Sequence, residues 1–397
     1  MSIQASQPKA PVVDTSAITE ITEGVWVIPD SGHTPLVPNI GIVVGARATL
    51  VIDTGFGPDN ARTVLEQARR LSDGRPIFLT HTHCHPEHGF GANVLAGEVT
   101  IVYNDAQWSE LQQKGPILLQ MFRKNFAALA PMLDGVEFVP PHLRYTGSLN
   151  LDLGRGRVAE LHEFGGAHSL GDQGILVRGP ASVLFTGDLV EEGTFGVLGD
   201  SDSHTVPWLD RVKRFEQLHP DLVVPGHGLP GGPERIADYR VYLELATRRV
   251  NELRAADELS EAEIADRVSA EVLGLHPDWQ NQIWARKAVE DLTWPARPLP
   301  ATRADAGTIW TEVNACPSRA RVIKSLARTR AREACTGERC HTPACCEDSA
   351  GWASTPKEET CRLPALLTVG ARAAGPAQTA GAARRPSRTR AGGGSWW

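Results

Sequence analysis

A histidine-rich segment constrains the fold of this chain more than any other feature. Residues 80–89 read THTHCHPEHG and hold four histidines and one glutamate within eight residues. They directly follow an apolar run, residues 76–79, which we interpret as a strand. Imidazole and carboxylate groups are the ligands that zinc and iron prefer. The segment therefore indicates a metal site in a loop, and because one metal cannot easily use all of these groups, a two-metal centre is the natural geometry.

Three further candidate ligands lie downstream, each in a loop flanked by glycine. His168 stands in GGAHSLGD, Asp188 in LFTGDL and His227 in VVPGHG. Glycine lets the backbone turn sharply beside a ligand, and each loop follows an expected strand. Asp53 ends another expected strand, in LVIDTG. The chain thus repeats one arrangement, a strand followed by a metal-ligand type of residue.

Apolar periodicity predicts a chain of mixed strands and helices. The expected strands span residues 25–28, 40–44, 49–53, 76–79, 99–103, 148–153, 158–164, 174–177, 182–185 and 222–224. The expected helices run from Pro58 to a stop at Gly74, over residues 104–133, around residues 209–218, and twice or three times between residues 236 and 292. Ser260 and Glu263 form a capping box that opens one of these last helices. This order predicts a layered α/β domain.

Taken together and in this order, the motifs resemble the metallo-β-lactamase fold superfamily over about residues 20–295. The family's H-x-H-x-D-H run is similar to His83, His85, Glu87 and His88, with Glu87 standing where the family usually has aspartate. Its later histidine, bridging aspartate, last histidine and structural aspartate are similar to His168, Asp188, His227 and Asp53. The resemblance implies a four-layer αββα sandwich with the metals at one edge of its two sheets.

The resemblance also implies a ligand set and a reaction. It assigns one metal to His83, His85 and His168, the other to Glu87, His88 and His227, and the bridge between them to Asp188. The implied cofactor is Zn²⁺, two per chain, with iron as a possibility. The implied enzyme is a hydrolase in which a metal-bridging hydroxide attacks the carbonyl of a small ester, thioester or lactone. Asp188 and Glu87 are the expected catalytic carboxylates, and Asp53 is expected to orient the ligands by hydrogen bonding.

Other functions on the same fold stay open. Zinc β-lactamases usually carry Cys or Ser where Asp188 stands, so the chain is more similar to the glyoxalase II, lactonase and thioesterase branches. The alternative is a mono-iron oxidoreductase of the persulfide dioxygenase type. A non-enzymatic binding module is disfavoured because the ligand set is complete.

Several residues near the motifs carry more than one interpretation. His81 is expected to support the ligands or the structure rather than bind metal, and Cys84 is expected to face the sheet. His204 is a candidate for contact with substrate. Segment 104–147 is rich in aromatic residues and methionine, and it forms either an apolar substrate wall or an ordinary packing face or dimer contact.

Composition divides the chain into unequal parts. Residues 297–397 carry 16 Lys and Arg against 8 Asp and Glu, a net charge of +8, while the whole chain carries −7. This tail lacks apolar periodicity, so we expect it to be low-complexity and disordered. We expect a flexible N-terminus over residues 1–19, the metallo-β-lactamase-fold domain over 20–235, and C-terminal helices packed on that domain over 236–296.

Charge, cysteine usage and hydropathy bear on partners and location. No apolar run approaches the roughly 18 residues that a membrane span needs, and six of the seven cysteines follow residue 315. We therefore expect a cytoplasmic protein that acts on a small molecule, without nucleic acid or membrane partners, and possibly as a homodimer.

Overall fold

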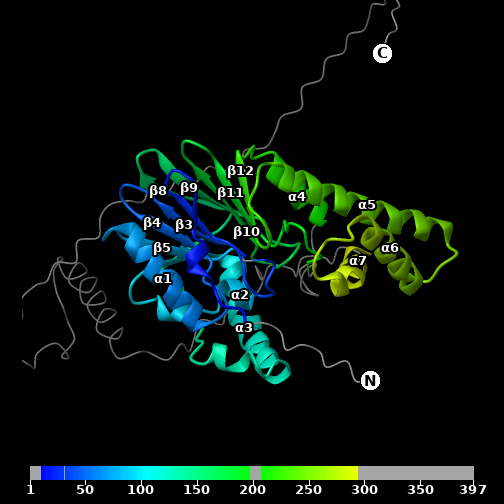
Figure 1. Cartoon of the computed structure of the whole chain (residues 1–397), viewed down its shortest axis with the longest axis horizontal. Coiled ribbons are helices and arrows are strands. Elements are labelled where there is room, and N and C mark those ends of the chain that lie inside the picture. The colour runs from blue at the N-terminus through cyan, green and yellow to red at the C-terminus, as the bar shows by residue number, and fades with distance from the viewer. Residues whose placement is uncertain (1–9, 31, 197–206, 294–397) are drawn as a thin grey trace, which may run out of the picture.

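The computed structural model describes residues 10–30, 32–196 and 207–293, and it places two β-sheets between layers of helices (Figure 1). The first sheet has seven strands in the order β1-β2-β3-β4-β5-β6-β7. Its strands are Thr19–Thr22, Val25–Ile28, Ile40–Val44, Thr49–Ile52, Ile77–Thr80, Thr100–Asn104 and Leu143–Tyr145. The second sheet has five strands in the order β12-β11-β10-β9-β8. In chain order, β8 to β12 are Ser148–Gly154, Arg157–Glu163, Gln173–Arg178, Val183–Gly187 and Leu222–Pro225.

Seven α-helices surround the sheets in the described part of the chain. They are α1 Pro58–Ser72, α2 Pro86–Gly89, α3 Asp105–Asn125, α4 Trp208–Glu216, α5 Glu234–Ala256, α6 Glu261–Leu275 and α7 Ala285–Thr293. Four short 3₁₀ turns, η1 to η4, cover Thr15–Ala17, Ala92–Val94, Ala130–Leu133 and Gln282–Trp284. The capping box of Ser260 and Glu263 forms as predicted at the start of α6.

Alternation along the strands creates three separate cores. In β4, Leu50 and Ile52 pack against the second sheet, whereas Val51 faces α1 on the opposite side. The same rule holds in β11 of the second sheet, where Phe185 points between the sheets and Leu184 points toward α4 and α5. The cores therefore lie between helices and first sheet, between the two sheets, and between second sheet and helices. This confirms the predicted αββα sandwich.

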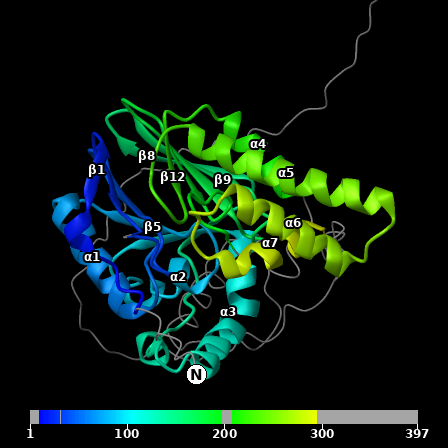
Figure 2. The same cartoon turned by 45° about the vertical axis from the view of Figure 1, so that its right-hand side comes forward.

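The C-terminal helices belong to the outermost layer. Helix α5 packs on α4, and α6 and α7 pack on α5, so that this part of the chain extends beyond the sheets (Figures 1 and 2). Tyr239 and Tyr242 of α5 share one core with Leu184 and Val223 of the second sheet. The division into domains at residues 20–235 and 236–296 stays a prediction, and the predicted tail at 297–397 lies outside the described residues.

The sheet topology brings strand ends to a common edge. Strands β4 and β5 are parallel neighbours, as are β11 and β12. Parallel neighbours end at the same edge of a sheet, so Asp53, the histidine-rich loop, Asp188 and His227 all emerge together. Two expectations required correction. The predicted helix over 104–133 ends at Asn125, and two short strands, β1 and β7, were not predicted, because such short strands carry too little apolar alternation to be recognised.

Candidate metal centre

The histidine-rich segment forms a loop followed by a single helical turn. Strand β5 ends at Thr80, and His85 is the N-cap of the four-residue helix α2. Pro86 occupies the first helical position, where its lack of an N–H costs nothing. The turn places Glu87 and His88 on the helix while His83 and His85 remain in the preceding loop. The segment thereby delivers its side chains toward two positions.

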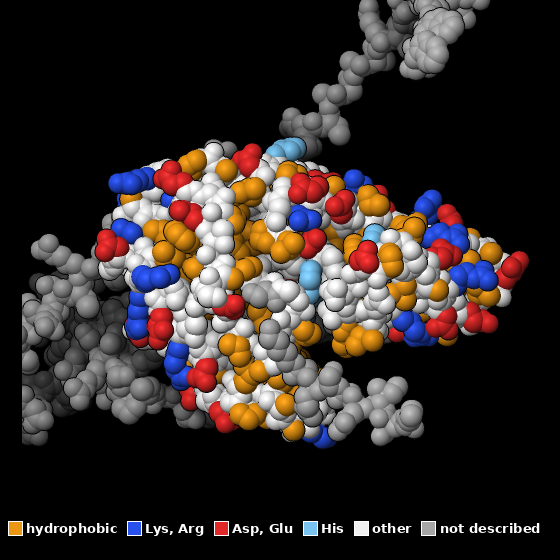
Figure 3. Space-filling model, in the orientation of Figure 1, with side chains coloured by type: hydrophobic (Ala, Val, Ile, Leu, Met, Phe, Trp, Pro, Cys, Tyr) orange, Lys and Arg blue, Asp and Glu red, His pale blue; other side chains and the backbone are white. Residues whose placement is uncertain are grey.

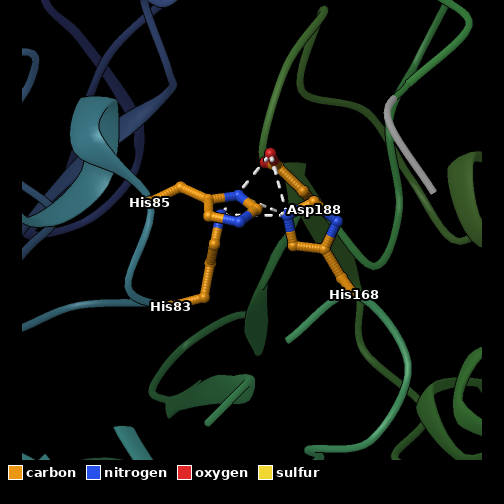
Figure 4. A group of neighbouring side chains, drawn as sticks. All are labelled: His83, His85, His168 and Asp188. Atoms are coloured by element: carbon orange, nitrogen blue, oxygen red, sulfur yellow. Dashed lines mark hydrogen bonds and ion pairs between the residues drawn. The ribbon is translucent and has the colours of Figure 1, made fainter. Parts of the chain in front are cut away.

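The first position gathers three imidazoles and one carboxylate. Ligand atoms of His83, His85, His168 and Asp188 all lie within 4.8 Å of one another. Nε2 of His168 lies 3.1 Å from Nε2 of His83 and 2.8 Å from Nδ1 of His85. Figure 4 shows these rings pointing toward one another, with the Asp188 carboxylate beside them. Three ring nitrogens converging on one point are the donor set of a bound cation such as zinc.

The second position shares Asp188 with the first. Ligand atoms of Glu87, His88, Asp188 and His227 again lie within 4.8 Å of one another. Nε2 of His88 is 3.4 Å from Oδ1 of Asp188, and Nε2 of His227 is 3.7 Å from Oδ2. Among the described residues, Nε2 of His88 and Oε2 of Glu87 are buried without a hydrogen-bond partner. A buried polar atom without a partner is costly, and a metal ion here would satisfy both atoms.

Two loops orient the ligands of the second position from outside. Oδ2 of Asp53 lies 2.9 Å from Nδ1 of His88, and Thr82 donates to the same carboxylate through its N–H and its hydroxyl. Nδ1 of His227 lies 3.1 Å from the carbonyl oxygen of Val37. In the neutral rings, acceptors at Nδ1 fix the tautomer in which Nδ1 carries the proton and Nε2 is the nitrogen available to a metal. Asp53 thus stands where the resemblance implied, supporting a ligand.

Glycine is required where the backbone approaches Asp188. A Cβ on Gly226 would lie 1.9 Å from Oδ1 of Asp188, and a Cβ on Gly187 would lie 2.7 Å from Cβ of Thr82. Gly187 also has a φ of 54°, which disfavours other residues. The glycines beside Asp188 and His227 therefore serve close packing of the loops around the shared carboxylate.

Burial and neighbouring charged groups shift the pKa values of Asp188 and His88 in opposite directions. Burial would raise the pKa of Asp188, but the imidazoles of His88 and His227 outweigh it and lower that pKa well below its usual range. Burial likewise opposes charge on His88, yet Asp188 and Asp53 together raise its pKa well above the ordinary value. Desolvation lowers the pKa of His83. Asp188 is therefore ionised, which is the state required of a metal ligand.

The structure shows where several residues beside the ligand motifs lie. His81 is buried with its ring 5.0 Å from that of Tyr103, and it belongs to neither group of candidate ligands. Cys84 is buried in the core between the first sheet and its helices. In segment 104–147, Trp108 and Phe122 pack against this same core, while Phe126 is 43% exposed. His204, the predicted substrate contact, lies outside the described residues.

The sequence analysis did not single out Glu191 as a candidate site residue, although its buried carboxylate lies three residues after Asp188. Burial and the neighbouring Asp188 raise the pKa of Glu191 to about 8. The run GDLVEE contains Glu191 and the adjacent Glu192, which have the same side chain. Glu192 is partly exposed, and the sequence does not show which of the two glutamates is buried.

Comparison with known proteins places these observations in a family. The family model described as the metallo-beta-lactamase superfamily matches residues 33–227. A linear primary-alkylsulfatase from Pseudomonas sp. (strain ATCC 19151) is 24% identical over 228 residues, which are 50% of this chain and 43% of the relative. The chain thus spans less than half the length of that curated relative.

A solved structure shows a similar fold. The sec-alkylsulfatase Pisa1 from Pseudomonas sp. superposes with a TM-score of 0.52 and 17% identity, covering 80% of this chain and 56% of that one. The DIM-1 metallo-β-lactamase superposes with a TM-score of 0.44 and 17% identity, covering 59% and 97%. From its family match, its two facing sheets and its ordered ligand motifs, the chain belongs to the metallo-β-lactamase superfamily.

Proposed function

We propose that the chain is a two-metal hydrolase that cleaves a small ester, thioester or lactone. One observation carries the proposal, namely that two groups of buried and partly buried candidate ligands share the carboxylate of Asp188. A carboxylate common to two groups would hold two cations close together, as in enzymes that activate one water between two metals. The mixture of imidazole and carboxylate donors suits zinc.

The chain's own residues would hold and orient the reacting groups. His83, His85 and His168 would bind the first cation, and Glu87, His88 and His227 the second. When bound, the cations would lower the pKa of water toward about 7 and polarise the scissile bond. Asp53 and the Val37 carbonyl would keep the second-position imidazoles in the tautomer that binds metal. No serine or cysteine nucleophile is needed for this chemistry.

A second substrate class is favoured by a specific observation. The curated relative at 24% identity is a linear primary-alkylsulfatase, so sulfate esters belong beside carboxylic esters in any substrate test. The same ligands would serve either bond, because both reactions need an activated water and positive charge beside the oxygen on which negative charge develops. The alternative stays a mono-iron oxidoreductase of the persulfide dioxygenase type, which would use a similar His/Asp set with one iron.

Partners and location extend the proposal. On the face seen in Figure 3, acidic and basic side chains are interspersed over the described residues rather than gathered by sign. Such a surface supports a small-molecule substrate over nucleic acid. Within the described ranges, none of the helices is long and apolar enough to cross a membrane. We propose a cytoplasmic enzyme, with a homodimer as the assembly to test.

The deciding experiment combines metal analysis with a substrate panel. Protein purified without added metal is assayed for zinc and iron, and the metal-replete enzyme is run against chromogenic esters, thioesters, lactones and an alkyl sulfate. We expect two zinc ions per chain and turnover of one ester class, with Asp188→Ala reducing that turnover by at least about 100-fold. One iron per chain with oxygen uptake would support the oxidoreductase instead, and absence of turnover with every class would contradict the hydrolase.

A further inference from the structure

Helix α3 contacts both loops that carry the histidines of the first metal position. Gln107 and Glu110 are three residues apart, so they lie on one face of the helix. Their exposed fractions are 1% and 3%, and both are polar groups in the interior. Helix α3 lies beside α2 in both views of the chain (Figures 1 and 2). The ligand motifs do not include either residue.

Glu110 holds the loop of His168 through its backbone. The carboxylate accepts hydrogen bonds from the N–H of Leu170 at 2.8 Å and from the N–H of Gly171 at 2.7 Å. Lys114, one helical turn later, donates to Glu110 Oε1 at 2.7 Å. Hydrogen bonds from two successive N–H groups to a charged carboxylate are strong, so they hold the loop in one conformation.

Asp172 completes this hold from the other side. Its Oδ2 accepts from the N–H of His168 at 3.0 Å and from the N–H of Ser169 at 2.8 Å. Four consecutive N–H groups, residues 168–171, are therefore bound by two buried carboxylates. Asp172 belongs to the same loop, whereas Glu110 comes from α3 and is the residue that fixes the loop relative to the rest of the fold.

Gln107 holds the other loop. Its Nε2 donates to the carbonyl oxygen of His81 at 2.6 Å, two residues before His83. Its Cα also lies 2.3 Å from where a Cβ on Gly171 would stand, so the loop of His168 packs directly on the helix backbone. The N-cap residue Asn104 strengthens this contact by donating to the Gly171 carbonyl at 2.9 Å. One turn of α3 thus spans the gap between the two loops.

We propose that Gln107 and Glu110 are positioning residues that set the place of His168 relative to His83 and His85. This inference rests on the proposed two-metal function. The histidine ligands of the first position all lie on the two loops that α3 holds, whereas the second position takes His227 from the loop after β12. Because His168 belongs to the first position only, loosening α3's hold on its loop weakens the first position more than the second. Groups behind a ligand typically change metal affinity by about 10- to 100-fold.

Glu110→Gln is the principal test variant. The carboxamide keeps the size of the side chain, but its NH₂ group meets one of the two backbone N–H donors and cannot accept from it. We expect affinity for zinc at the first position to fall by about 10- to 100-fold, with the second position changed by less than about threefold. Gln113→Ala, on the exposed face of the same helix, is the matched control and is expected to leave both affinities unchanged.

The measurement is a titration of metal-free protein with Zn²⁺ against a chromophoric chelator, repeated with Co²⁺ to follow each position by its absorption. His168→Ala and His227→Ala identify the signals of the first and second positions. Gln107→Met removes the bond to the His81 carbonyl and provides an independent second variant. The melting temperature of metal-free protein is recorded for each, because a merely structural role would lower it without changing the ratio of the two affinities.

The outcomes separate the two proposals. An unchanged ratio of affinities in Glu110→Gln, or in Gln107→Met should the first variant not accumulate, would overturn the positioning role and leave the two-metal function intact. Wild-type protein that binds fewer than two metals would overturn the two-metal function and the positioning role with it. A selective loss at the first position supports both.

Discussion

Nδ1 of His88 lies 2.9 Å from Oδ2 of Asp53, and both side chains are buried. A carboxylate accepts only, so this contact requires the proton on Nδ1, and in the neutral ring it leaves Nε2 as the nitrogen that can bind a metal on the side of Asp188. Asp53 has a φ of 69°, a left-handed conformation that aspartate and asparagine tolerate better than most residues. The strained residue after β4 thus determines which nitrogen of His88 faces the second metal position.

Asp53→Asn is expected to weaken the second metal position. The amide can donate to Nδ1 of His88, which would move the ring proton to Nε2 and direct it at the metal. Asparagine tolerates the same φ, so the backbone is preserved. We expect zinc affinity at the second position to fall by about 10- to 100-fold. Asp59→Asn, with a side chain that is 88% exposed, is the control. Equal affinities in the titration would contradict the role of Asp53.

His162 is expected to make the fold sensitive to acid at a site away from the metals. Burial in β9 lowers its pKa, and the nearby Arg214 adds to this effect, although Glu160 opposes it. At a pH above about 6.5, the usual pKa of histidine in an unfolded chain, His162 is neutral in both states, and its lowered pKa does not reduce the stability of the fold. Stability is lost as the pH falls below that value, because the unfolded chain takes up the proton first.

The matching measurement is the free energy of unfolding of metal-free protein at pH 7.5 and pH 5.5. His162→Gln is expected to lose less stability between these values than wild type, and to match wild type at pH 7.5. A variant with the same pH dependence as wild type would show that the burial of His162 carries no cost.

Most strands and the ligand loops could be predicted from local patterns, because the residues that indicate each of them lie close together in the sequence. The short run of β-branched and apolar residues in Thr49–Ile52 and the glycines around Asp188 are readable from the chain itself. The shared centre was predicted from the resemblance to the family, and the parallel pairing of β4 with β5 and of β11 with β12 gives its physical reason. The structure brings the candidate ligand atoms of each group within 4.8 Å of one another, and Asp188 belongs to both groups.

Long-range partners could not be predicted in the same way. Glu110 is 60 residues from Leu170, and in the sequence it is one more charged residue on an amphipathic helix. Asn39 gave no signal either, although its amide donates to the carbonyls of Pro225 and Gly228 on both sides of His227. The partners of such residues are distant in the sequence and come close only in the folded chain, so no local sequence pattern indicates them.

Glu87→Asp tests the departure from the family pattern. The carboxylate of Glu87 is among the second group of ligands, and the substitution withdraws it by about one C–C bond of 1.5 Å. We expect the variant to retain two metals with equal or tighter binding, because aspartate is usual at this position in the family. Glu66→Asp on the exposed face of α1 is the control. Loss of one metal ion, measured by elemental analysis, would show that the longer side chain is required here.

Gly226→Ala is expected to disable the centre without replacing any ligand residue. The new Cβ would stand 1.9 Å from Oδ1 of Asp188 and 2.8 Å from its backbone N, so the shared carboxylate has to move. A displacement of about 1 Å in a reacting assembly costs on the order of 100-fold in rate, and we expect a fall in kcat of that size. Gly97→Ala is the control, because a Cβ there meets no described atom within 4 Å. Both variants are compared in kcat and in bound zinc, and normal values for Gly226→Ala would show that Asp188 does not need its observed place.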